Sequence, residues 1–264
     1  MLHSLQGASV LCLAVSAVLF AAFGYALAKR SLVPINEAWE KQRRFAANTS
    51  HELRNPLAVI QTNAELLLRH PDSSVQDESE HVAAILDSSG RMSSMLATLL
   101  TLARADADED EISRERVCLS DVLEETCAQF TQIGAGRGVA VAYDIVPAVQ
   151  VMGDRKRLAE LFSILLDNAI RYTEPGGIVR ATCTCATRDA TVTIGDSGIG
   201  MSPDDRARVF QRFYRSDGAR DANPEGTGLG LPIAQWIAER HNAEMHLESE
   251  EGRGTVVAIV FAGM

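Results

Sequence analysis

The stretch "FAANTSHELRNPL", residues 45–57, places a histidine, an acid, a base, an amide and a proline within six consecutive positions that begin at His51. A proline inside a helix removes a backbone hydrogen bond, here the one to the carbonyl of Glu52, and disfavours helical geometry at the preceding Asn55. Such a residue is not expected in a helix that is only structural. We therefore expect a soft point at Pro56, where bending would expose His51.

Two amphipathic helices contain and follow this stretch. Apolar residues recur at three- and four-residue spacing from Pro34 to about Arg69, and again from about Val75 to Ala105. The intervening "HPDSS" ends the first helix, so the two helices should form an antiparallel hairpin. A hairpin with one apolar stripe on each helix cannot enclose a core alone. We expect it to form an all-α, homodimeric four-helix bundle.

An uncharged apolar run of 21 residues, from Ala8 to Ala28, precedes the first helix. As a helix it would measure about 31 Å, which matches the hydrocarbon core of a bilayer, so we expect an N-terminal transmembrane helix. A cleaved signal peptide is the alternative, but no Lys or Arg precedes the run. Basic residues follow it, which predicts a single-pass protein of the inner or plasma membrane with its remaining chain in the cytoplasm. Because few residues precede the run, we expect no extracellular sensor domain before it, so that sensing would occur within the membrane, through a partner protein, or on a part that is missing if the chain begins late.

The composition argues against one class of partner and against a disulfide framework. A net charge of -10 and an isoelectric point near 5.1 argue against nucleic acid, because phosphate binding requires a surplus of Lys and Arg on one face. The five cysteines are scattered, which predicts free thiols in a reducing compartment. Cys183 and Cys185 form a CxC, but no second pair lies at metal-ligand spacing and "IVRATCTCAT" alternates like a strand.

An acidic break, "RADADEDE" at residues 104–111, separates the helices from the rest of the chain. We therefore expect three parts: a transmembrane segment at 1–30, a helical domain at 31–106, and a second domain at 107–264 that is long enough to bury its own core. Elements of both types with locally paired strands favour an α+β sandwich for this second domain. The pattern predicts helices near 119–132, 154–172 and 231–240, a hairpin at 178–195 that turns at "TRDA", and strands near 139–145, 244–249 and 254–262.

Three glycine-rich segments of the second domain, "IGDSGIGMS", "EGTGLGLPIA" and "EGRGT", indicate a phosphate site. Glycines let backbone N–H groups approach an anion, and the second segment leads into a helix N-terminus. The GxGxG spacing and the lack of a Walker lysine argue against a dinucleotide fold. For any single loop, a tight turn remains the alternative.

A helix expected over "LFSILLDNAIRYT", residues 161–173, places Asn168 and Arg171 on one face, with Tyr172 beside them. An amide oxygen can bind Mg2+, and an arginine can bind a phosphate. On its own, however, Asn168 would more often be a surface amide.

Five segments, "FAANTSHELRNPL", "LLDNAIRYT", "DSGIG", "VFQRFYR" and "GTGLGL", resemble in sequence and order the H, N, G1, F and G2 boxes of membrane-bound two-component sensor histidine kinases. The resemblance covers residues 31–264. It implies a dimeric helical hairpin that carries a phosphoacceptor histidine, followed by an ATP-binding domain of the gyrase type. Such a kinase autophosphorylates from Mg-ATP, passes the phosphoryl group to an aspartate on the receiver domain of a response regulator, and often acts as a phosphatase too. The alternatives are a gyrase- or chaperone-type ATPase without phosphohistidine and a phosphatase-dominant scaffold of the same fold.

By motif position, the resemblance makes His51 the nucleophile and Glu52 the group that accepts or directs its proton. Asn55 would orient a water molecule for phosphatase activity. We expect His51 to be exposed to solvent, because other residues already define the apolar face of the helix and its neighbour Glu52 is charged.

In the ATP-binding domain, the resemblance makes Asp196 the acceptor for the adenine amino group and Asn168 the ligand of Mg2+. The segment "VFQRFYRSDGARDANPEG" would form a flexible lid, in which Arg215 can neutralise phosphate charge. The residues implied in nucleotide binding are Asn168, Arg171, Tyr172, Asp196, Gly198, Gly200, Arg215, Gly226, Thr227, Gly228, Leu229 and Gly230.

The chain departs from the family pattern at two positions. Ile164 occupies a place where the N box often carries a first asparagine, so one polar contact near the metal is missing. Glu225 precedes Gly226 where a glycine is common. Neither position belongs to the residues to which we assign chemistry, but both bear on catalytic strength.

Overall fold

The computed structural model of the 264-residue chain describes residues 2–69, 73–107, 113–186, 189–223 and 226–262. The chain divides into two compact units, Met1–Asn55 and Pro56–Met264, which we describe separately. The boundary falls inside the stretch that contains His51. The histidine therefore belongs to the first unit and the glycine-rich segments belong to the second.

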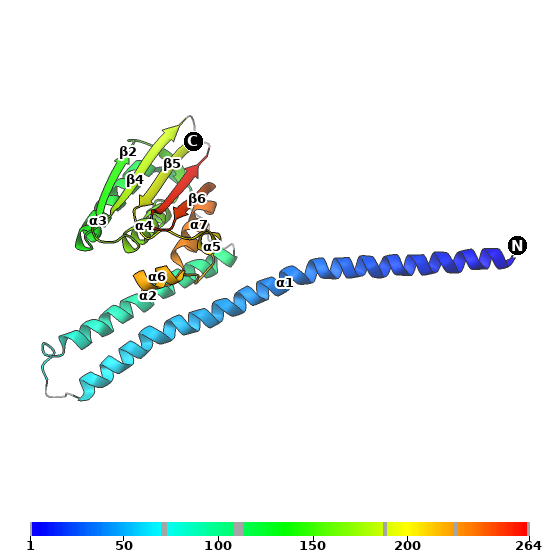
Figure 1. The fold of residues 1–264 in the computed structure, drawn as a ribbon, viewed down its shortest axis with the longest axis horizontal. Coiled ribbons are helices and arrows are strands. Elements are labelled where there is room, and N and C mark those ends of the chain that lie inside the picture. The colour runs from blue at the N-terminus through cyan, green and yellow to red at the C-terminus, as the bar shows by residue number, and fades with distance from the viewer. Residues whose placement is uncertain (1, 70–72, 108–112, 187–188, 224–225, 263–264) are drawn as a thin grey trace. The chain divides into compact units, whose positions relative to one another are not determined.

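Helix α1, Leu2–Arg69, makes up the first unit and continues into the second. It runs through Pro34, so the predicted start of the helix at Pro34 is wrong: the apolar run and the amphipathic segment join in one helix (Figure 1). The helix also runs through Pro56, and the expected loss of helical geometry at Asn55 is not observed. Long helical segments on both sides explain this, since extending an existing helix is far easier than nucleating one.

The predicted transmembrane segment falls on a part of α1 in which most side chains lie outside the described residues. Within the portion of the chain that the structure does describe, no helix is both long and apolar enough to cross a bilayer.

The second unit begins with the predicted helical hairpin. The last turns of α1 are followed by α2, Ser79–Ala107, and the two helices are linked by a 2.8 Å hydrogen bond between Asn63 Oδ1 and His81 Nδ1. The Asn63 Nδ2 donates to the carbonyl of Val59 at 2.8 Å, which orients the Oδ1 towards the histidine. Helix α2 extends past the predicted start of the acidic break, and residues 108–111 of that break lie outside the described part of the chain.

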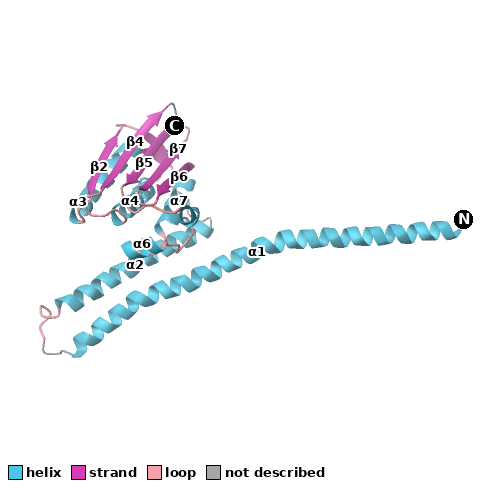
Figure 2. Ribbon diagram, in the orientation of Figure 1, coloured by secondary structure: helices cyan, strands magenta, loops and turns pink. Residues whose placement is uncertain are grey.

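A five-stranded mixed sheet forms the frame of the C-terminal part, and the predicted α+β sandwich is confirmed. Its strand order is β2-β4-β5-β7-β6, in which β2 and β4 are parallel and all other neighbours are antiparallel. Helices cover one face of this sheet (Figure 2). The strands are β2 Ala140–Ile145, β4 Ile178–Ala186, β5 Asp189–Asp196, β6 Ala243–Glu250 and β7 Gly254–Phe261, and the helices are α3 Leu119–Gly136, α4 Arg155–Arg171 and α7 Gly230–Arg240.

The core lies between the sheet and the helices because the strands alternate. On β4, Val179, Ala181 and Cys183 are fully buried, whereas Arg180 and Thr182 between them are exposed and partly exposed, respectively. Cys183 therefore packs in the core, as the strand pattern predicted. Burial raises the pKa of the Cys183 thiol to about 11, which suits a packing residue because the reactive thiolate form is suppressed.

Four short elements were not predicted. They are strands β1 Glu115–Cys118 and β3 Gln150–Gly153, which pair with each other, and helices α5 Pro203–Arg208 and α6 Asp217–Ala222. Segments this short do not display a full hydrophobic period, so the sequence pattern cannot identify them. Both helices nevertheless carry a serine cap, since Ser202 and Ser216 each accept a hydrogen bond from an N–H in the first turn.

Candidate functional site

A cavity of about 680 Å³ lies in the second unit, and its lining includes residues of α4, the end of β5, the 209–226 segment, the start of α7 and β7. This volume is typical of sites that bind small molecules. Two of the residues expected to bind nucleotide, Gly198 and Leu229, are buried and do not line the cavity. The structure brings the others together around it: Asn168, Arg171, Tyr172, Asp196, Gly200, Arg215, Gly226, Thr227, Gly228 and Gly230.

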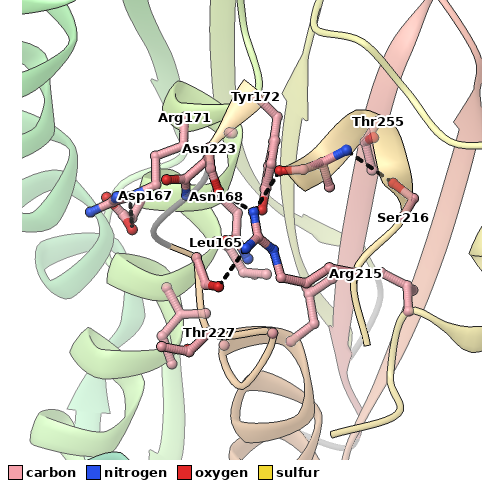
Figure 3. A pocket seen from close by; sticks show the side chains of 18 of the residues that line it. Leu165, Asp167, Asn168, Arg171, Tyr172, Arg215, Ser216, Asn223, Thr227 and Thr255 are labelled. Atoms are coloured by element: carbon pink, nitrogen blue, oxygen red, sulfur yellow. Dashed lines mark hydrogen bonds and ion pairs between the residues drawn. The ribbon is translucent and has the colours of Figure 1, made fainter. Parts of the chain in front are cut away.

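Helix α4 presents a polar edge to this cavity because its start and its buried face are well defined. The Asp154 Oδ1 caps the helix, accepting hydrogen bonds from two N–H groups of the first turn at 2.8 and 3.2 Å. Leu161 and Leu165 are buried in the core, whereas Asn168 and Arg171 remain partly exposed. The amphipathic helix thus directs its amide and guanidinium groups towards the cavity, and Figure 3 shows Asn168 and Arg171 among the side chains that line it.

Arg171 and Tyr172 are both held in place at the end of α4. The Arg171 Nε donates to Asp167 Oδ2 at 2.6 Å, one helical turn away. Tyr172 is the C-cap residue, and its carbonyl accepts a hydrogen bond from the N–H of Ile199 at 3.0 Å. The loop after β5, which contains Gly198 and Gly200, is therefore attached to the end of α4. This attachment brings the loop and the polar end of α4 to the same cavity.

Ile164 also lines the cavity and is partly buried. Its Cγ2 would lie 3.2 Å from a Cβ placed on Gly230, so the isoleucine packs against the first turn of α7. It supplies an apolar contact at the position where the family pattern often has an amide. The other departure, Glu225, lies outside the described residues.

Asp196 is the partly buried acid at the end of β5. Its Oδ1 accepts hydrogen bonds from the backbone N–H of Gly198 at 2.9 Å and from that of Thr255 at 3.2 Å. Burial raises the pKa of the Asp196 carboxyl, and these two hydrogen bonds oppose that shift. The arrangement holds a carboxylate against the cavity in a fixed direction.

A backbone contact joins Phe213, near the start of the 209–226 segment, to Gly228, which lies just after its end. The Phe213 N–H donates to the carbonyl of Gly228 at 3.0 Å. Gly228 has a φ of 67°, and a Cβ at this position would lie 2.7 Å from the carbonyl oxygen of Tyr214. Only glycine fits here without strain. Phe213 itself has a φ of 63°, which is costly for a bulky residue and points to a constrained loop end.

Arg215 bridges backbone carbonyls within that segment. Its guanidinium donates to the carbonyl of Gly226 at 2.7 Å, to that of Ala219 at 2.7 Å, and also to that of Asn223 (Figure 3). Ala219 lies in α6 and Asn223 is its C-cap residue, and the Ala219 carbonyl also accepts the backbone N–H of Asn223 at 3.2 Å. Arg215 lines the cavity as expected, but in this structure its donors stabilise the conformation of the segment.

Several cavity and loop residues were not identified from the sequence, among them Tyr214, Asp205 and Ser202, which bind one another. Tyr214 Oη donates to Asp205 Oδ1 at 2.6 Å, and Ser202 Oγ donates to Asp205 Oδ2 at 2.7 Å. The hydrogen bond from Tyr214 is the largest cause of a lowered pKa at Asp205. The tetrapeptide "SPDD" at 202–205 has the signature of a helix start and could have revealed α5, but the partnership with Tyr214 requires the folded loop.

In the first unit, His51 and Asn55 are exposed and Glu52 is partly exposed. The expectation that His51 is accessible to solvent is thus confirmed. All three residues are helical, and Asn55 follows His51 by four residues, one helical turn. An exposed imidazole next to a carboxylate on a rigid helix can act as a nucleophile whose proton is removed or directed by the acid.

Two family models match the chain. The model described as the His Kinase A (phospho-acceptor) domain matches residues 41–108, and that described as the histidine kinase-, DNA gyrase B-, and HSP90-like ATPase matches residues 153–262. Together they cover more than half of the chain, and the first contains His51 whereas the second contains most of the residues that line the cavity. The ATPase match implies ATP with Mg2+.

Known proteins with similar sequence or fold agree with these matches. The sensor histidine kinase RppB of Synechocystis sp. is 34% identical over 249 residues, which are 94% of this chain and 54% of that protein. The histidine kinase AdeS of Acinetobacter baumannii has a solved structure with a TM-score of 0.66 at 20% identity, covering 81% of this chain and 98% of that one. Histidine kinase ThkA, solved in complex with response regulator protein TrrA, has a TM-score of 0.65 at 18% identity, covering 84% of this chain and 61% of that one. The chain spans about half the length of the curated relatives it matches.

Proposed function

Because this chain belongs to the two-component sensor histidine kinases, we propose that it transfers the γ-phosphoryl group of ATP to His51 and then to an aspartate of a response regulator. The observation that carries the proposal is one chain that holds both an exposed His51 within the phosphoacceptor match and a nucleotide-sized cavity lined mainly by residues of the ATPase match. A conformational ATPase of the gyrase or chaperone type would need only the cavity. The match at residues 41–108 therefore favours the kinase.

In the proposed reaction, one ring nitrogen of His51 attacks the γ-phosphorus in line with the bond to the bridging oxygen. The N–P bond forms, the P–O bond breaks and ADP leaves. Glu52 accepts the ring proton or fixes the tautomer that exposes the attacking nitrogen. Asn55, one turn along the same exposed surface, would orient water when the phosphoryl group is hydrolysed instead.

The residues around the cavity fit ATP with Mg2+. The Asp196 Oδ2 can accept a hydrogen bond from the adenine amino group, because the backbone donors described above both bind Oδ1. Arg171, Tyr172 and Arg215 would contact the ribose and the phosphates. Bound Mg2+ would neutralise phosphate charge, and the Asn168 amide oxygen is the side-chain ligand that this edge of the cavity offers. Gly198 and Leu229 would support the pocket from below its surface, and Gly200, Gly226, Thr227, Gly228 and Gly230 would form its glycine-rich wall.

Dimerisation through the hairpin is part of the proposal. Large apolar side chains are exposed on the last turns of α1 and on α2, although a stable soluble domain rarely leaves so many uncovered. A second copy of the hairpin would cover them in a four-helix bundle. These side chains are Leu57, Val59, Leu68, Leu86, Leu96 and Leu100.

We also propose the finer organisation of the chain: a membrane segment at 1–30, a dimerisation and phosphoacceptor domain at 31–106 and a catalytic ATP-binding domain at 107–264. The uncharged run from Ala8 to Ala28 supports the membrane segment. Resistance of the membrane-bound chain to carbonate extraction would support it, and release of the intact chain into the soluble fraction would contradict it.

Labelling with γ-32P-ATP and Mg2+ tests the central step. The wild-type chain should acquire a label that is stable in base and labile in acid, as a phosphoramidate is, and His51→Gln should acquire none. His246→Gln is the matched control, because His246 is also exposed but lies on β6. It should be labelled like the wild type.

Two outcomes would overturn the proposal. Label that persists on His51→Gln would show that another residue accepts the phosphoryl group. Hydrolysis of ATP by the wild-type chain without any labelled protein would favour the conformational ATPase instead.

A further inference from the structure

Ser249 does not line the cavity, yet it binds two residues of the turn that contacts Asp196. On strand β6 it lies opposite Thr255 of β7. Its Oγ donates to the carbonyl of Gly254 at 3.0 Å and lies 2.9 Å from the Thr255 Oγ1. Because a hydroxyl has a single proton, donation to Gly254 leaves the Ser249 Oγ as the acceptor for the proton of Thr255. Ser249 therefore fixes both the turn and the Thr255 side chain.

The turn between β6 and β7 is seated directly against Asp196. Gly254 has a φ of 96°, and a Cβ on it would lie 1.9 Å from the backbone oxygen of Asp196. The N–H of Gly252 also donates to the carbonyl of Ile199 at 2.7 Å, on the loop after β5. At such close approach, a displacement of the turn must displace Asp196 or the loop that follows it.

Thr255 transmits the position of the turn to the carboxylate. Its backbone N–H and that of Gly198 both donate to Asp196 Oδ1. Two donors on one oxygen restrict rotation of the carboxylate, and Oδ2 accepts no hydrogen bond from the residues that the structure describes. Oδ2 is thus the acceptor that remains for a ligand in the cavity.

We propose that Ser249 is a positioning residue for base specificity: through Gly254 and Thr255 it holds the Asp196 carboxylate so that Oδ2 faces the 6-amino group of adenine. The inference rests on the proposed binding of ATP and adds to it the determinant of base recognition. The "EGRGT" segment thereby acquires a role in recognition of the base, in contrast to the phosphate contact that glycine-rich loops commonly make.

Binding of two nucleotides by the full chain tests this. Dissociation constants are measured with Mg2+ for ATP and for purine riboside triphosphate, which lacks the 6-amino group but keeps the ring, ribose and phosphates. The wild type should prefer ATP. Ser249→Ala should weaken ATP binding about 2- to 10-fold and leave the analogue unchanged, because only ATP uses the oriented Oδ2. Ser249→Thr keeps the hydroxyl and should restore the preference.

A control variant and a replacement variant complete the test. Thr193→Val removes a hydroxyl from β5 of the same sheet, outside the cavity lining, and should keep the wild-type preference. Ser249→Cys, which is closer in size to serine and is a weak hydrogen-bonding group, replaces the alanine variant if that one does not fold.

Equal weakening of the binding of both nucleotides by Ser249→Ala, or no change in the binding of either, would overturn the positioning role. A wild-type chain that binds neither nucleotide would overturn the proposed function and this inference with it, whereas one that binds both equally would overturn the inference alone.

Discussion

The backbone N–H of Asp154 donates to the Nε2 of His241 at 3.0 Å, and the Nδ1 of the same ring lies 2.8 Å from the carbonyl of Ile237. Nδ1 therefore carries the ring proton and Nε2 presents its lone pair. His241 is a buried C-cap of α7, and Asp154 is the N-cap of α4, so one neutral imidazole joins the ends of the two helices that border the cavity. A second proton on the ring would face the N–H of Asp154 and abolish this hydrogen bond.

This geometry predicts a loss of stability in mild acid. Burial lowers the pKa of His241 below 6.5, Arg114 adds to that effect, and the hydrogen bond to Ile237 and the charge of Asp154 oppose it. The unfolded chain therefore binds a proton at a higher pH than the folded chain does. The contribution of His241 to stability should be constant above about pH 7.5, fall as the pH drops through 6.5 towards the folded pKa, and do so by at most about 1.4 kcal/mol per pH unit.

Denaturant unfolding at several pH values measures this effect. His241→Gln can still accept the Asp154 N–H but does not titrate, so it should lose the part of the pH dependence that His241 causes. The same slope in wild type and variant would assign the acid sensitivity to other groups.

Arg215→Lys should loosen the 209–226 segment. A lysine cannot bridge three carbonyls as the planar guanidinium does, so the end of α6 would lose partners. Amide hydrogen exchange in this segment should accelerate about tenfold, because about one net hydrogen bond of local stability is lost. Arg220→Lys is the matched control, since Arg220 lies on the same segment and pairs with Asp217 at the surface. Equal exchange rates in the two variants would refute the bridging role.

Gly228→Ala should destabilise the chain by about 1–2 kcal/mol or more, from the positive φ together with the contact to the Tyr214 carbonyl. Gly136→Ala provides a control, because Gly136 is helical and nothing lies within 4 Å of a Cβ placed there. Its replacement should be neutral or slightly stabilising. Urea unfolding of both variants gives the comparison, and similar midpoints for the two would contradict the steric argument.

Pro56→Ala should stabilise α1 by up to about 3 kcal/mol, since it restores an N–H that can donate to the carbonyl of Glu52. The helix is continuous in this structure, so the effect concerns its stiffness and not its presence. We expect a stiffer helix beside His51 to change the ratio of autophosphorylation to phosphatase activity. Rates that both match the wild type would leave Pro56 without a functional role.

Much of the fold could be predicted because apolar residues recur at a regular spacing along the long helices and strands. Helix α4 and strands β4 and β5 were expected within a few residues of their observed bounds. The continuity of α1 could not be predicted, because Pro34 is a strong local stop signal whereas helix propagation from both sides depends on a longer stretch. Strands β1 and β3 need each other as partners, although the 31 residues from 119 to 149 separate them, and no local pattern expresses such a pairing.

The order of the motifs along the chain was sufficient to indicate a phosphoacceptor histidine followed by a nucleotide domain, because each motif is short and its chemistry depends on residue type. The order of the motifs could not indicate how the side chains of the site are oriented. Thr255 and Asp196 are 59 positions apart, and their hydrogen bond exists because β5 and β7 pair in one particular register. Arg215 was expected to contact phosphate from its charge, while its carbonyl partners depend on how the loop between Phe213 and Gly228 closes. Spacing along a helix or strand specifies neighbours only within a few residues, so contacts between distant segments depend on packing and strand register.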